Sequence, residues 1–466
     1  MPQATKYDVI VIGTSQGGRF LPIAFAKAGR KVALVERGPL GGVCVNFGCT
    51  PTKTMVASAR VAYLAKRGAE YGVGTGSISV DLQGVRKRKQ NMVQGARNYF
   101  ESLVKPLAGL DLLRGEARFN ASKTLEISLK DGETLAITAP LIFIDTGARP
   151  KQLTIKGVDS VPVLNSTTIM ELETLPEHLL IIGGGYIGLE FGQMFRRFGS
   201  QVTIIQHHPR LLMNEDEDVS DEVTKIFRED GITILTESTP QQVQSLSGGH
   251  IQLTLRTPQD ERQLTGSHLL AAIGRVPNTE ALTPEAAGIH LDKRGYIQVN
   301  EQLETNVPGI YVMGDVKGGP AFTHVSYDDF RILRTNLLEH GSASTLDRLV
   351  PHTIFIDPQL GRVGLTENEA RKQGRNIRVA KLPMNAVIRA LETGETRGFM
   401  KAIVDPDTQQ ILGCAIPSLE GGEIMAIIQT AIMGKLPYTA LRDGIFTHPT
   451  LAEGLNALFM TLDSQV

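Results

Sequence analysis

A repeated pattern of apolar runs and glycine-rich turns constrains the fold of this chain more than any other feature. Residues 9–12 and 32–35 are apolar runs separated by a glycine-rich turn, and residues 179–182 and 202–205 repeat the pattern 170 positions later. An apolar strand that runs into a glycine-rich turn is typical of the start of a βαβ unit. The repeat therefore predicts an α/β protein with two Rossmann-like nucleotide-binding domains.

The two glycine-rich turns differ in how well they fit the dinucleotide-binding fingerprint. The second, Gly183-Gly184-Gly185-Tyr186-Ile187-Gly188, fits it completely. In the first, Gly13-Thr14-Ser15-Gln16-Gly17-Gly18, Ser15 replaces the middle glycine, while Gly17 adds a position without a side chain. Glycine-rich turns also occur for packing alone, but Glu36 follows the next apolar run, where a carboxylate would hydrogen-bond the ribose of an adenosine.

The second unit carries no carboxylate at the position that matches Glu36. Gln206, His207 and His208 stand there, followed by Arg210. A carboxylate would repel the 2′-phosphate of NADPH, whereas these amide, imidazole and guanidinium groups can bind it. We therefore expect a preference for NADPH, with equal use of NADPH and NADH as the alternative.

Two of the three cysteines in this chain of 466 residues, Cys44 and Cys49, fall within six residues of each other. In a reducing cytosol such a pair is more often catalytic or metal-binding than structural. Two cysteines alone make a poor closed zinc site, and no Cys-x-x-Cys pattern or histidine lies nearby. Thiols at this spacing can instead form a redox-active disulfide, and a helix start would stabilise the reacting thiolate. Cys414 follows an apolar run and is expected to be a buried core thiol.

Composition and charge exclude several other classes of function. The chain has 48 lysines and arginines against 49 aspartates and glutamates, so it offers no basic surface for nucleic acid or an acidic membrane. Its first residues lack the pattern of a signal peptide, and no apolar run reaches the roughly eighteen residues that span a bilayer. A cytoplasmic protein of about three domains, with no nucleic-acid or membrane partner, is expected.

The segment Cys44-Val45-Asn46-Phe47-Gly48-Cys49, after Gly41-Gly42, resembles the redox-active disulfide motif of the class I pyridine nucleotide-disulfide oxidoreductases. This family includes glutathione reductase, dihydrolipoyl dehydrogenase and mercuric reductase, and the resemblance covers essentially the whole chain. It implies FAD and NAD(P)H as cofactors and a homodimer built through a C-terminal α+β domain. The expected domains are residues 1–150 (first FAD-binding segment), 151–274 (NAD(P)H-binding), 275–345 (central segment completing the FAD site) and 346–466 (dimer interface).

The resemblance implies roles for four residues in electron and proton transfer. Cys49 is the thiol next to the flavin, and Cys44 is the outer thiol that attacks a substrate disulfide. His448, contributed by the other subunit, protonates the leaving thiolate. Glu453 holds that imidazole in the required tautomer.

Further residues are implied in binding the two cofactors. Lys53 and Glu190 match an ion pair next to the flavin and are also expected to be catalytic, because a fixed cation can stabilise negative charge on the reduced flavin. Tyr186 covers the nicotinamide face of the flavin until the cofactor enters. The expected FAD contacts are Gly13, Ser15, Gly17, Gly18, Glu36, Gly42, Lys53, Thr146, Gly147, Gly314 and Asp315. The expected NAD(P)H contacts are Gly183, Gly185, Tyr186, Gly188, Gln206, His207, His208 and Gly274. No resident metal site is expected.

The electron acceptor is the least constrained part of this prediction. The sequence around residues 314–331 and 436–443 is most similar to the mercuric-reductase-like branch, which implies a disulfide or a thiophilic ion such as Hg(II) or Cu(II) as substrate. A mercuric reductase ends in a vicinal cysteine pair and usually has tyrosine in place of His448; this sequence has no cysteine after Cys414, which disfavours Hg(II) handover. The alternatives are a dihydrolipoyl dehydrogenase, a glutathione-reductase-like enzyme, and a flavin-binding regulatory protein without turnover.

Overall fold

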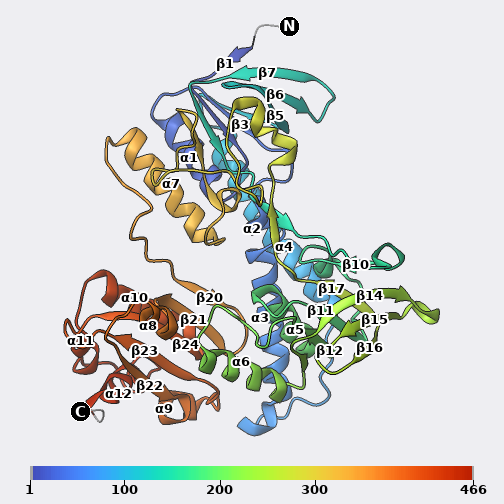
Figure 1. Ribbon diagram of the computed structural model, residues 1–466, viewed down its shortest axis with the longest axis vertical. Helices are drawn as coiled ribbons and strands as arrows, with labels where there is room; N and C mark the ends of the chain where they lie inside the picture. Colours follow the sequence, from blue (N-terminus) through green and yellow to red (C-terminus); the bar gives the residue numbers. More distant parts are fainter. Residues whose placement is uncertain (1–3, 464–466) are drawn as a thin grey trace. The chain divides into compact units, whose positions relative to one another are not determined.

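The computed structural model describes residues 4–463, and these residues form two compact units (Figure 1). Unit 1 consists of the chain up to Met55, Gln83–Lys151 and Gly274–Arg348. Unit 2 consists of Val56–Leu82, Gln152–Ile273 and the chain from Leu349 onward. Each unit is assembled from separate stretches of sequence, so residues that are distant in sequence meet within it.

Unit 1 is built around a five-stranded parallel sheet with the strand order β19-β8-β2-β3-β4. Its strands are β2 (Val9–Ile12), β3 (Val32–Val35), β4 (Leu110–Leu113), β8 (Leu141–Ile144) and β19 (Ile310–Val312). Alternate residues enter two hydrophobic clusters, Ile10 and Val35 one cluster, Val11 and Leu34 the other. Both faces of the sheet are therefore buried at its centre, which explains why β2, β3 and β8 are unbroken apolar runs in the sequence.

Helices connect and cover the strands of this sheet. The helices of unit 1 are α1 (Gln16–Lys27), α2 (Gly42–Asn46), the first turns of α3 (Cys49–Lys66), α4 (Leu82–Val104) and α7 (Thr323–Leu338). α1 packs beside α7, where the rings of Phe20 and Tyr327 meet edge to face with centroids 5.2 Å apart (Figure 1). This contact places the first glycine-rich turn next to a helix that lies 300 residues later in the chain.

Smaller elements complete unit 1. A second sheet has the order β1-β7-β6-β5, and a two-stranded ribbon pairs β9 with β18. These strands are β1 (Thr5–Lys6), β5 (Gly115–Ala121), β6 (Thr124–Leu129), β7 (Thr134–Thr138), β9 (Ala148–Pro150) and β18 (Arg275–Pro277). Single 3₁₀ turns are η5 (Glu280–Leu282), η6 (Pro284–Ala287) and η7 (Gly314–Lys317).

Unit 2 contains a second five-stranded parallel sheet, with the order β10-β17-β11-β12-β13. Its strands are β10 (Val163–Leu164), β11 (His178–Ile182), β12 (Gln201–Ile205), β13 (Thr233–Leu235) and β17 (His268–Ala271). An antiparallel sheet of β14 (Thr239–Ser245), β15 (Ile251–Arg256) and β16 (Glu261–Gly266) accompanies it. The helices of this part are α5 (Tyr186–Phe198) and α6 (Glu217–Glu229), with 3₁₀ turns η1 (Gly68–Tyr71), η2 (Val158–Ser160), η3 (Thr168–Glu171) and η4 (Ser247–Gly249).

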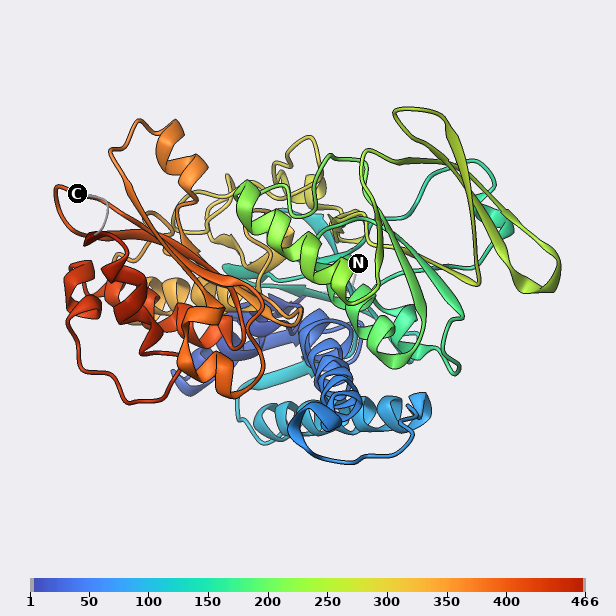
Figure 2. The same cartoon turned by 90° about the horizontal axis from the view of Figure 1, so that it is seen from below.

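The C-terminal part of unit 2 is α+β. Its antiparallel sheet has the order β20-β21-β24-β23-β22, and α10 packs against β21 and β24 (Figure 2). The strands are β20 (His352–Ile354), β21 (Gln359–Gly364), β22 (Arg378–Pro383), β23 (Phe399–Val404) and β24 (Ile411–Ser418). The helices are α8 (Glu367–Lys372), η8 (Met384–Ala386), α9 (Ile388–Glu392), α10 (Gly421–Met433), α11 (Tyr438–Arg442) and α12 (Gly454–Met460).

The architecture confirms the predicted fold class, with two nucleotide-binding sheets and a C-terminal α+β part. Cys414 lies in β24 within the hydrophobic core and is fully buried. Burial raises the pKa of this thiol to about 12, so Cys414 stays a neutral core side chain at physiological pH. Among the described residues, no helix is long and apolar enough to cross a membrane.

Candidate active site

The two neighbouring cysteines lie where one short helix of unit 1 ends and a longer one begins. Cys44 lies in α2, and Cys49 is the first residue of α3. Gly42 precedes Cys44 with a φ angle of +60°, and a side chain on it would come within 2.7 Å of Ser15 Cα. The cysteine segment is therefore packed directly on the first glycine-rich turn, and this close approach requires glycine at position 42.

Positive charge and hydrogen-bonding groups surround the thiol pair. Cys44 is hydrogen-bonded to Cys49, and this contact, together with burial and the charge of Cys49, raises the pKa of Cys44. The hydroxyl of Thr323, the first residue of α7, lies 3.1 Å from Cys49 Sγ. The charge of Arg19 acts on Cys44 and that of Arg275 acts on Cys49. These groups stabilise one negative charge on the pair, which thiol chemistry requires.

The first glycine-rich turn has the geometry of a phosphate-binding turn. Gly13 has a φ angle of +102°, and a side chain there would meet the carbonyl oxygen of Asp145 at 2.3 Å. A side chain on Gly18 would meet the carbonyl oxygen of Gly13 at 2.3 Å. The N–H of Gly17 donates to Ser326 Oγ at 3.0 Å. The N-terminus of α1 follows directly, and its N–H groups and positive dipole end favour an anion.

The second glycine-rich turn repeats this geometry in unit 2. Gly183 has a φ angle of +115°, and a side chain there would meet the carbonyl oxygen of Ala272 at 2.3 Å. A side chain on Gly188 would meet the carbonyl oxygen of Gly183 at 2.0 Å. Gly185 caps α5, and no other group lies within 4 Å of the place where its Cβ would stand. The two turns are structurally equivalent, as the sequence repeat predicts.

Asp145 is a buried acid beneath the first turn that the sequence did not single out as a site residue. The hydroxyl of Ser15 donates to its carboxyl group at 2.5 Å and the N–H of Gly18 at 2.7 Å. Burial raises the pKa of Asp145 to about 8; these two hydrogen bonds oppose the rise, and the nearby carboxylates of Asp315 and Asp329 add to it. In the sequence Asp145 was visible only as the residue after an apolar run, because its partner at position 15 is 130 residues away.

The predicted FAD contacts follow the carboxyl ends of neighbouring parallel strands of the unit 1 sheet. Gly13 follows β2, Glu36 follows β3, Thr146 lies after β8 and Gly314 lies after β19. Because these strands are parallel, their carboxyl ends share one edge of the sheet, where ligands of doubly wound folds bind.

Glu36 is nearly buried and orders the backbone around it. Its Oε2 accepts hydrogen bonds from the N–H and hydroxyl of Thr14 at 3.0 and 2.5 Å, and its Oε1 accepts one from the N–H of Gly38 at 2.7 Å. A carboxylate offers about four acceptor positions. One position therefore remains open, and the predicted hydrogen bond from a ribose hydroxyl would need such a position.

The other predicted FAD residues lie in loops held by hydrogen bonds within unit 1. Thr146 Oγ1 donates to the carbonyl oxygen of Asn278 at 2.8 Å, and Gly147 has a φ angle of +67°. The N–H of Gly314 donates to Asp329 at 2.8 Å. Burial raises the pKa of Asp315, the residue predicted to contact the ribitol.

The predicted NAD(P)H contacts Gln206, His207 and His208 lie at the matching edge of the unit 2 sheet. Gln206 follows β12, is largely buried, and donates through Nε2 to the carbonyl oxygen of Arg210 at 3.2 Å. The rings of His207 and His208 lie with centroids 3.8 Å apart, and burial and the charge of His208 lower the pKa of His207. Gly274, the remaining predicted contact in this region of the sequence, belongs to unit 1 and has a φ angle of +106°.

Tyr186, the residue expected to cover the flavin, contacts a histidine that the sequence did not single out. Its hydroxyl lies 3.1 Å from His352 Nε2, and the two rings stack with centroids 5.5 Å apart. His352 Nε2 lies 3.5 Å from Glu215 Oε1. Burial, with a smaller contribution from Glu215, raises the pKa of Tyr186 to about 12. Tyr186 is therefore a neutral phenol held by a side chain of unit 2.

Lys53 and Glu190 belong to different units, and their ion pair stays a prediction. Glu190 lies in α5, is largely buried, and accepts a hydrogen bond from the N–H of Phe355 at 2.9 Å. Lys53 lies one turn after Cys49 in α3. Each residue is thus fixed by a helix of its own unit.

His448 and Glu453 form a hydrogen-bonded pair in unit 2. His448 Nδ1 lies 2.9 Å from one carboxylate oxygen of Glu453 and 3.1 Å from the other. The imidazole is 68% exposed and the carboxylate 19%. Since Nδ1 donates to the carboxylate, Nε2 is the nitrogen that can exchange a proton with another molecule.

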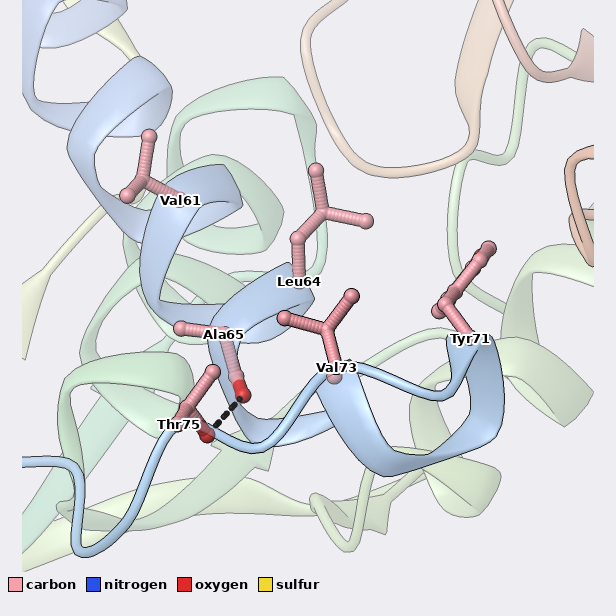
Figure 3. Close-up of a pocket in the computed structure, with 7 residues that line it drawn as sticks. Val61, Leu64, Ala65, Tyr71, Val73 and Thr75 are labelled. Atoms are coloured by element: carbon pink, nitrogen blue, oxygen red, sulfur yellow. Dashed lines mark hydrogen bonds between the residues drawn. The ribbon is translucent and has the colours of Figure 1, made fainter.

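An apolar pocket of about 470 Å³ lies at the end of α3 in unit 2 (Figure 3). Its lining includes Val61, Leu64, Tyr71 and Val73. The hydroxyl of Thr75, also at the pocket, donates to the carbonyl oxygen of Ala65 at 3.1 Å. No ionisable group that could act as a nucleophile, acid or base lines this pocket apart from the Tyr71 phenol, so we do not assign chemistry to it.

Comparison with known proteins gives two matches to family models. The family described as pyridine nucleotide-disulphide oxidoreductase matches residues 7–329, and the dimerisation domain of the same family matches residues 350–458. Together they span most of the chain.

Individual relatives resemble the chain over nearly its whole length. The probable pyridine nucleotide-disulfide oxidoreductase RclA of Escherichia coli K12 is 39% identical over 97% of this chain and 99% of that protein. A mercuric reductase of Staphylococcus aureus is 34% identical over 99% of this chain and 83% of its own length. A dihydrolipoyl dehydrogenase of Thermus scotoductus is 34% identical over 96% of each chain.

A solved structure gives the same result in three dimensions. The HOCl-induced flavoprotein disulfide reductase RclA from Escherichia coli superimposes with a TM-score of 0.89 at 38% identity, covering 97% of this chain and 99% of that chain. The Cu(II) complex of the same protein has a TM-score of 0.89 at 38% identity and covers 98% and 99%.

Proposed function

Because the chain belongs to the pyridine nucleotide-disulphide oxidoreductase family and is a flavoprotein oxidoreductase that uses FAD and NAD(P)H, we propose that its electrons pass through Cys44 and Cys49 to a disulfide or a thiophilic metal ion. One observation carries this proposal. The two thiols are hydrogen-bonded to each other and their segment packs on a glycine-rich turn shaped for a phosphate.

The first turn and its sheet edge fit FAD. Side chains at Gly13, Gly18 and Gly42 would collide with backbone or with Ser15, so the turn keeps a close-packed backbone surface for a pyrophosphate. Glu36 keeps an acceptor for the adenosine ribose. FAD, when bound, accepts hydride from the nicotinamide and relays two electrons to a disulfide.

Cys44 and Cys49 deliver the electrons by thiol–disulfide exchange. The thiolate of Cys44 attacks one sulfur of the substrate disulfide, which forms a mixed disulfide and releases one thiolate. Cys49 then attacks Cys44, releases the second thiolate and restores the Cys44–Cys49 disulfide. In total, NADPH, a proton and one disulfide give NADP⁺ and two thiols.

The His448–Glu453 pair transfers protons in this mechanism. The pKa of Cys44 is raised, so its thiol needs a base before it can attack. His448 Nε2 takes this proton and then gives it to the first leaving thiolate. Glu453 orients the ring through Nδ1. By family pattern the imidazole acts on the thiols of the other subunit, which makes the homodimer part of the mechanism.

Two kinds of acceptor fit the thiol pair. One relative, RclA of Escherichia coli, is a flavoprotein disulfide reductase with a solved Cu(II) complex, and others are mercuric reductases. Reduced Cys44 and Cys49 are soft ligands that suit such ions. Two Cu(II) ions would each take one electron, and NADPH would yield NADP⁺ and a proton.

A panel of acceptors tests the proposal. Purified holoenzyme is mixed anaerobically with NADPH or NADH, and then with Cu(II), Hg(II), oxidised glutathione, lipoamide or a quinone. Turnover with a disulfide or a thiophilic ion supports the proposal. Fast NAD⁺-dependent oxidation of dihydrolipoamide would establish a dihydrolipoyl dehydrogenase instead, and a flavin that NADPH does not bleach would indicate a regulatory protein.

Replacing Gln206 with glutamate is expected to shift cofactor preference toward NADH by at least about tenfold, equal to roughly 1.4 kcal/mol. A carboxylate at the end of β12 repels the 2′-phosphate of NADPH and hydrogen-bonds the ribose of NADH. The ratio of kcat/KM for the two cofactors measures the effect. The neutral variant Gln206→Asn serves as control and keeps the original ratio. An unchanged ratio in Gln206→Glu would show that the 2′-phosphate binds elsewhere.

Replacing Ile445 with glutamate is expected to convert the dimer to a monomer. Ile445 is 104% exposed in the chain and lies within the region that matches the dimerisation domain. A fully exposed isoleucine suits a partner surface, and a carboxylate there would have to be desolvated. Analytical ultracentrifugation measures the mass, and disulfide turnover should fall with it. Leu291→Glu, an exposed apolar position outside that region, is the matched control; equal effects of both variants would contradict this assignment.

A further inference from the structure

The two nucleotide-binding turns differ at two positions that touch in space. Where the second unit has Gly185 and Ala272, the first has Ser15 and Asp145. Asp145 and Ala272 are equivalent because each directly follows the strand beside the glycine turn and presents its carbonyl oxygen to the first glycine. A serine in place of glycine thus coincides with an acid in place of alanine.

We propose that Asp145 is a positioning residue for FAD: as a neutral carboxylic acid it draws the Ser15 hydroxyl inward, so that serine can stand where a phosphate-binding turn otherwise needs glycine. The inference rests on the proposed FAD site in the first turn. It adds a residue to that site, and it makes FAD binding depend on pH.

The hydrogen bonds show that the serine side chain is turned into the protein. Ser15 is the N-cap of α1, yet its side chain makes no capping hydrogen bond. Its hydroxyl instead donates to Asp145 Oδ2 at 2.5 Å, and the N–H of Gly18 donates to the same oxygen at 2.7 Å. Asp145 is 2% exposed. The hydroxyl therefore points into the protein interior, where it cannot obstruct a pyrophosphate.

The second oxygen of Asp145 shows which charge state the site accommodates. Oδ1 is buried and has no hydrogen-bond partner among residues 4–463, which the structure describes. It lies 2.9 Å from the place where a Cβ on Gly314 would stand, so the site has no room for a compensating side chain there. A buried anion with an unpartnered oxygen is costly, whereas a protonated acid leaves only a neutral hydroxyl unpartnered.

The charged groups that face Asp145 also favour the neutral form. They are Asp315 on η7 and Asp329 on α7, both acids. Lys317 and Arg348 pair with Asp329 at 3.3 and 2.8 Å. Neither cation pairs with Asp145 itself, whose hydrogen-bond donors are the neutral Ser15 and Gly18.

The Arg275 guanidinium, near Asp315 at 3.9 Å, completes the charged surroundings. The pKa of Asp145 is about 8, so the acid is mostly protonated at pH 7. Above pH 8 it ionises and places a negative charge beneath the pyrophosphate site. FAD then binds the protonated form better, so affinity falls as pH rises, by about tenfold between pH 7 and pH 9.

Variants separate this role from a general structural one. Asp145→Asn mimics the protonated acid, because an amide has one acceptor oxygen and one donor group. Asp145→Ala removes the partner of the serine. The double variant Ser15→Gly with Asp145→Ala copies the second unit and is the matched control.

FAD release from diluted holoenzyme, followed by flavin fluorescence between pH 6 and 9.5, tests the proposal. The wild type should release FAD increasingly above pH 8, and Asp145→Asn should retain it throughout. Asp145→Ala should weaken retention about tenfold with Ser15 present but little in the Ser15→Gly background.

Three results would overturn the proposal: pH-independent release from the wild type, the same pH dependence in Asp145→Asn, or an equal effect of Asp145→Ala in both backgrounds. If Asp145→Ala does not fold, the pH dependence of FAD release in the wild type and in Asp145→Asn still tests the proposal. Failure of the proposed function appears separately, as wild-type protein at pH 7 that holds no FAD or whose flavin NADPH does not bleach.

Discussion

Cys44→Ser holoenzyme is expected to keep a flavin that NADPH reduces while disulfide turnover falls by at least about 10³-fold. In the proposed mechanism Cys44 is the attacking thiol, so its loss would remove the nucleophile. The proposed FAD contacts at the sheet edge, Gly13 and Glu36 among them, stay in place in this variant, so the flavin should still bind and accept hydride. Stopped-flow absorbance of the flavin and steady-state NADPH oxidation with a disulfide measure the two steps separately.

Cys414→Ala provides the matched control for this variant. Cys414 is fully buried in β24 and belongs to the C-terminal core, so its loss should lower stability and spare turnover. Full disulfide turnover in Cys44→Ser would assign the attack to another group. Equal loss of turnover in both variants would mean that the effect is one of folding.

His448→Ala is expected to lower disulfide turnover by about 10²–10⁴-fold while leaving Cu(II) reduction nearly unchanged. A leaving thiolate needs a proton, whereas a metal ion that accepts an electron does not. The ratio of disulfide turnover to Cu(II) turnover therefore reports the role of the imidazole, because the fraction of correctly folded, FAD-loaded enzyme affects both activities equally. Sedimentation analysis is the control for whether the His448→Ala variant still forms the expected dimer.

Glu453→Gln gives a graded comparison for the same role. The amide can still contact the imidazole but does not stabilise its charged form, so the loss should be smaller than in His448→Ala. A parallel loss of disulfide and Cu(II) turnover in His448→Ala would contradict a role in proton transfer and favour a structural role at the interface.

The fold was predictable because both faces of the two parallel sheets are buried. Strands β2 and β3 and residues 179–182 of β11 therefore stand out as unbroken apolar runs, and β12 is apolar apart from Gln201 and Thr203. Glycines with positive φ angles, Gly13 and Gly183, mark the turns that follow β2 and β11. The cysteine pair was predictable for a similar reason, since its two members are close in sequence. The domain boundaries remain a prediction.

Other parts of the site were not predictable from one sequence because they depend on contacts between distant segments. Thr323 meets Cys49 across 274 positions, and Ser15 meets Asp145 across 130. A threonine at a helix start or an acid after a strand has many ordinary roles. Only the folded sheet, which brings the ends of β2 and β8 to one edge, gives these residues their neighbours.

Thiol counting during an anaerobic NADPH titration tests directly whether electrons from NADPH reach the Cys44–Cys49 pair. Oxidised holoenzyme is titrated with NADPH, quenched under denaturing conditions, and its free thiols are compared with those of untreated enzyme. We expect two additional thiols per chain in the wild type, none in Cys44→Ser, and two in Cys414→Ala. A flavin that bleaches fully in the wild type, even with excess NADPH, without any new thiol would contradict transfer through Cys44 and Cys49.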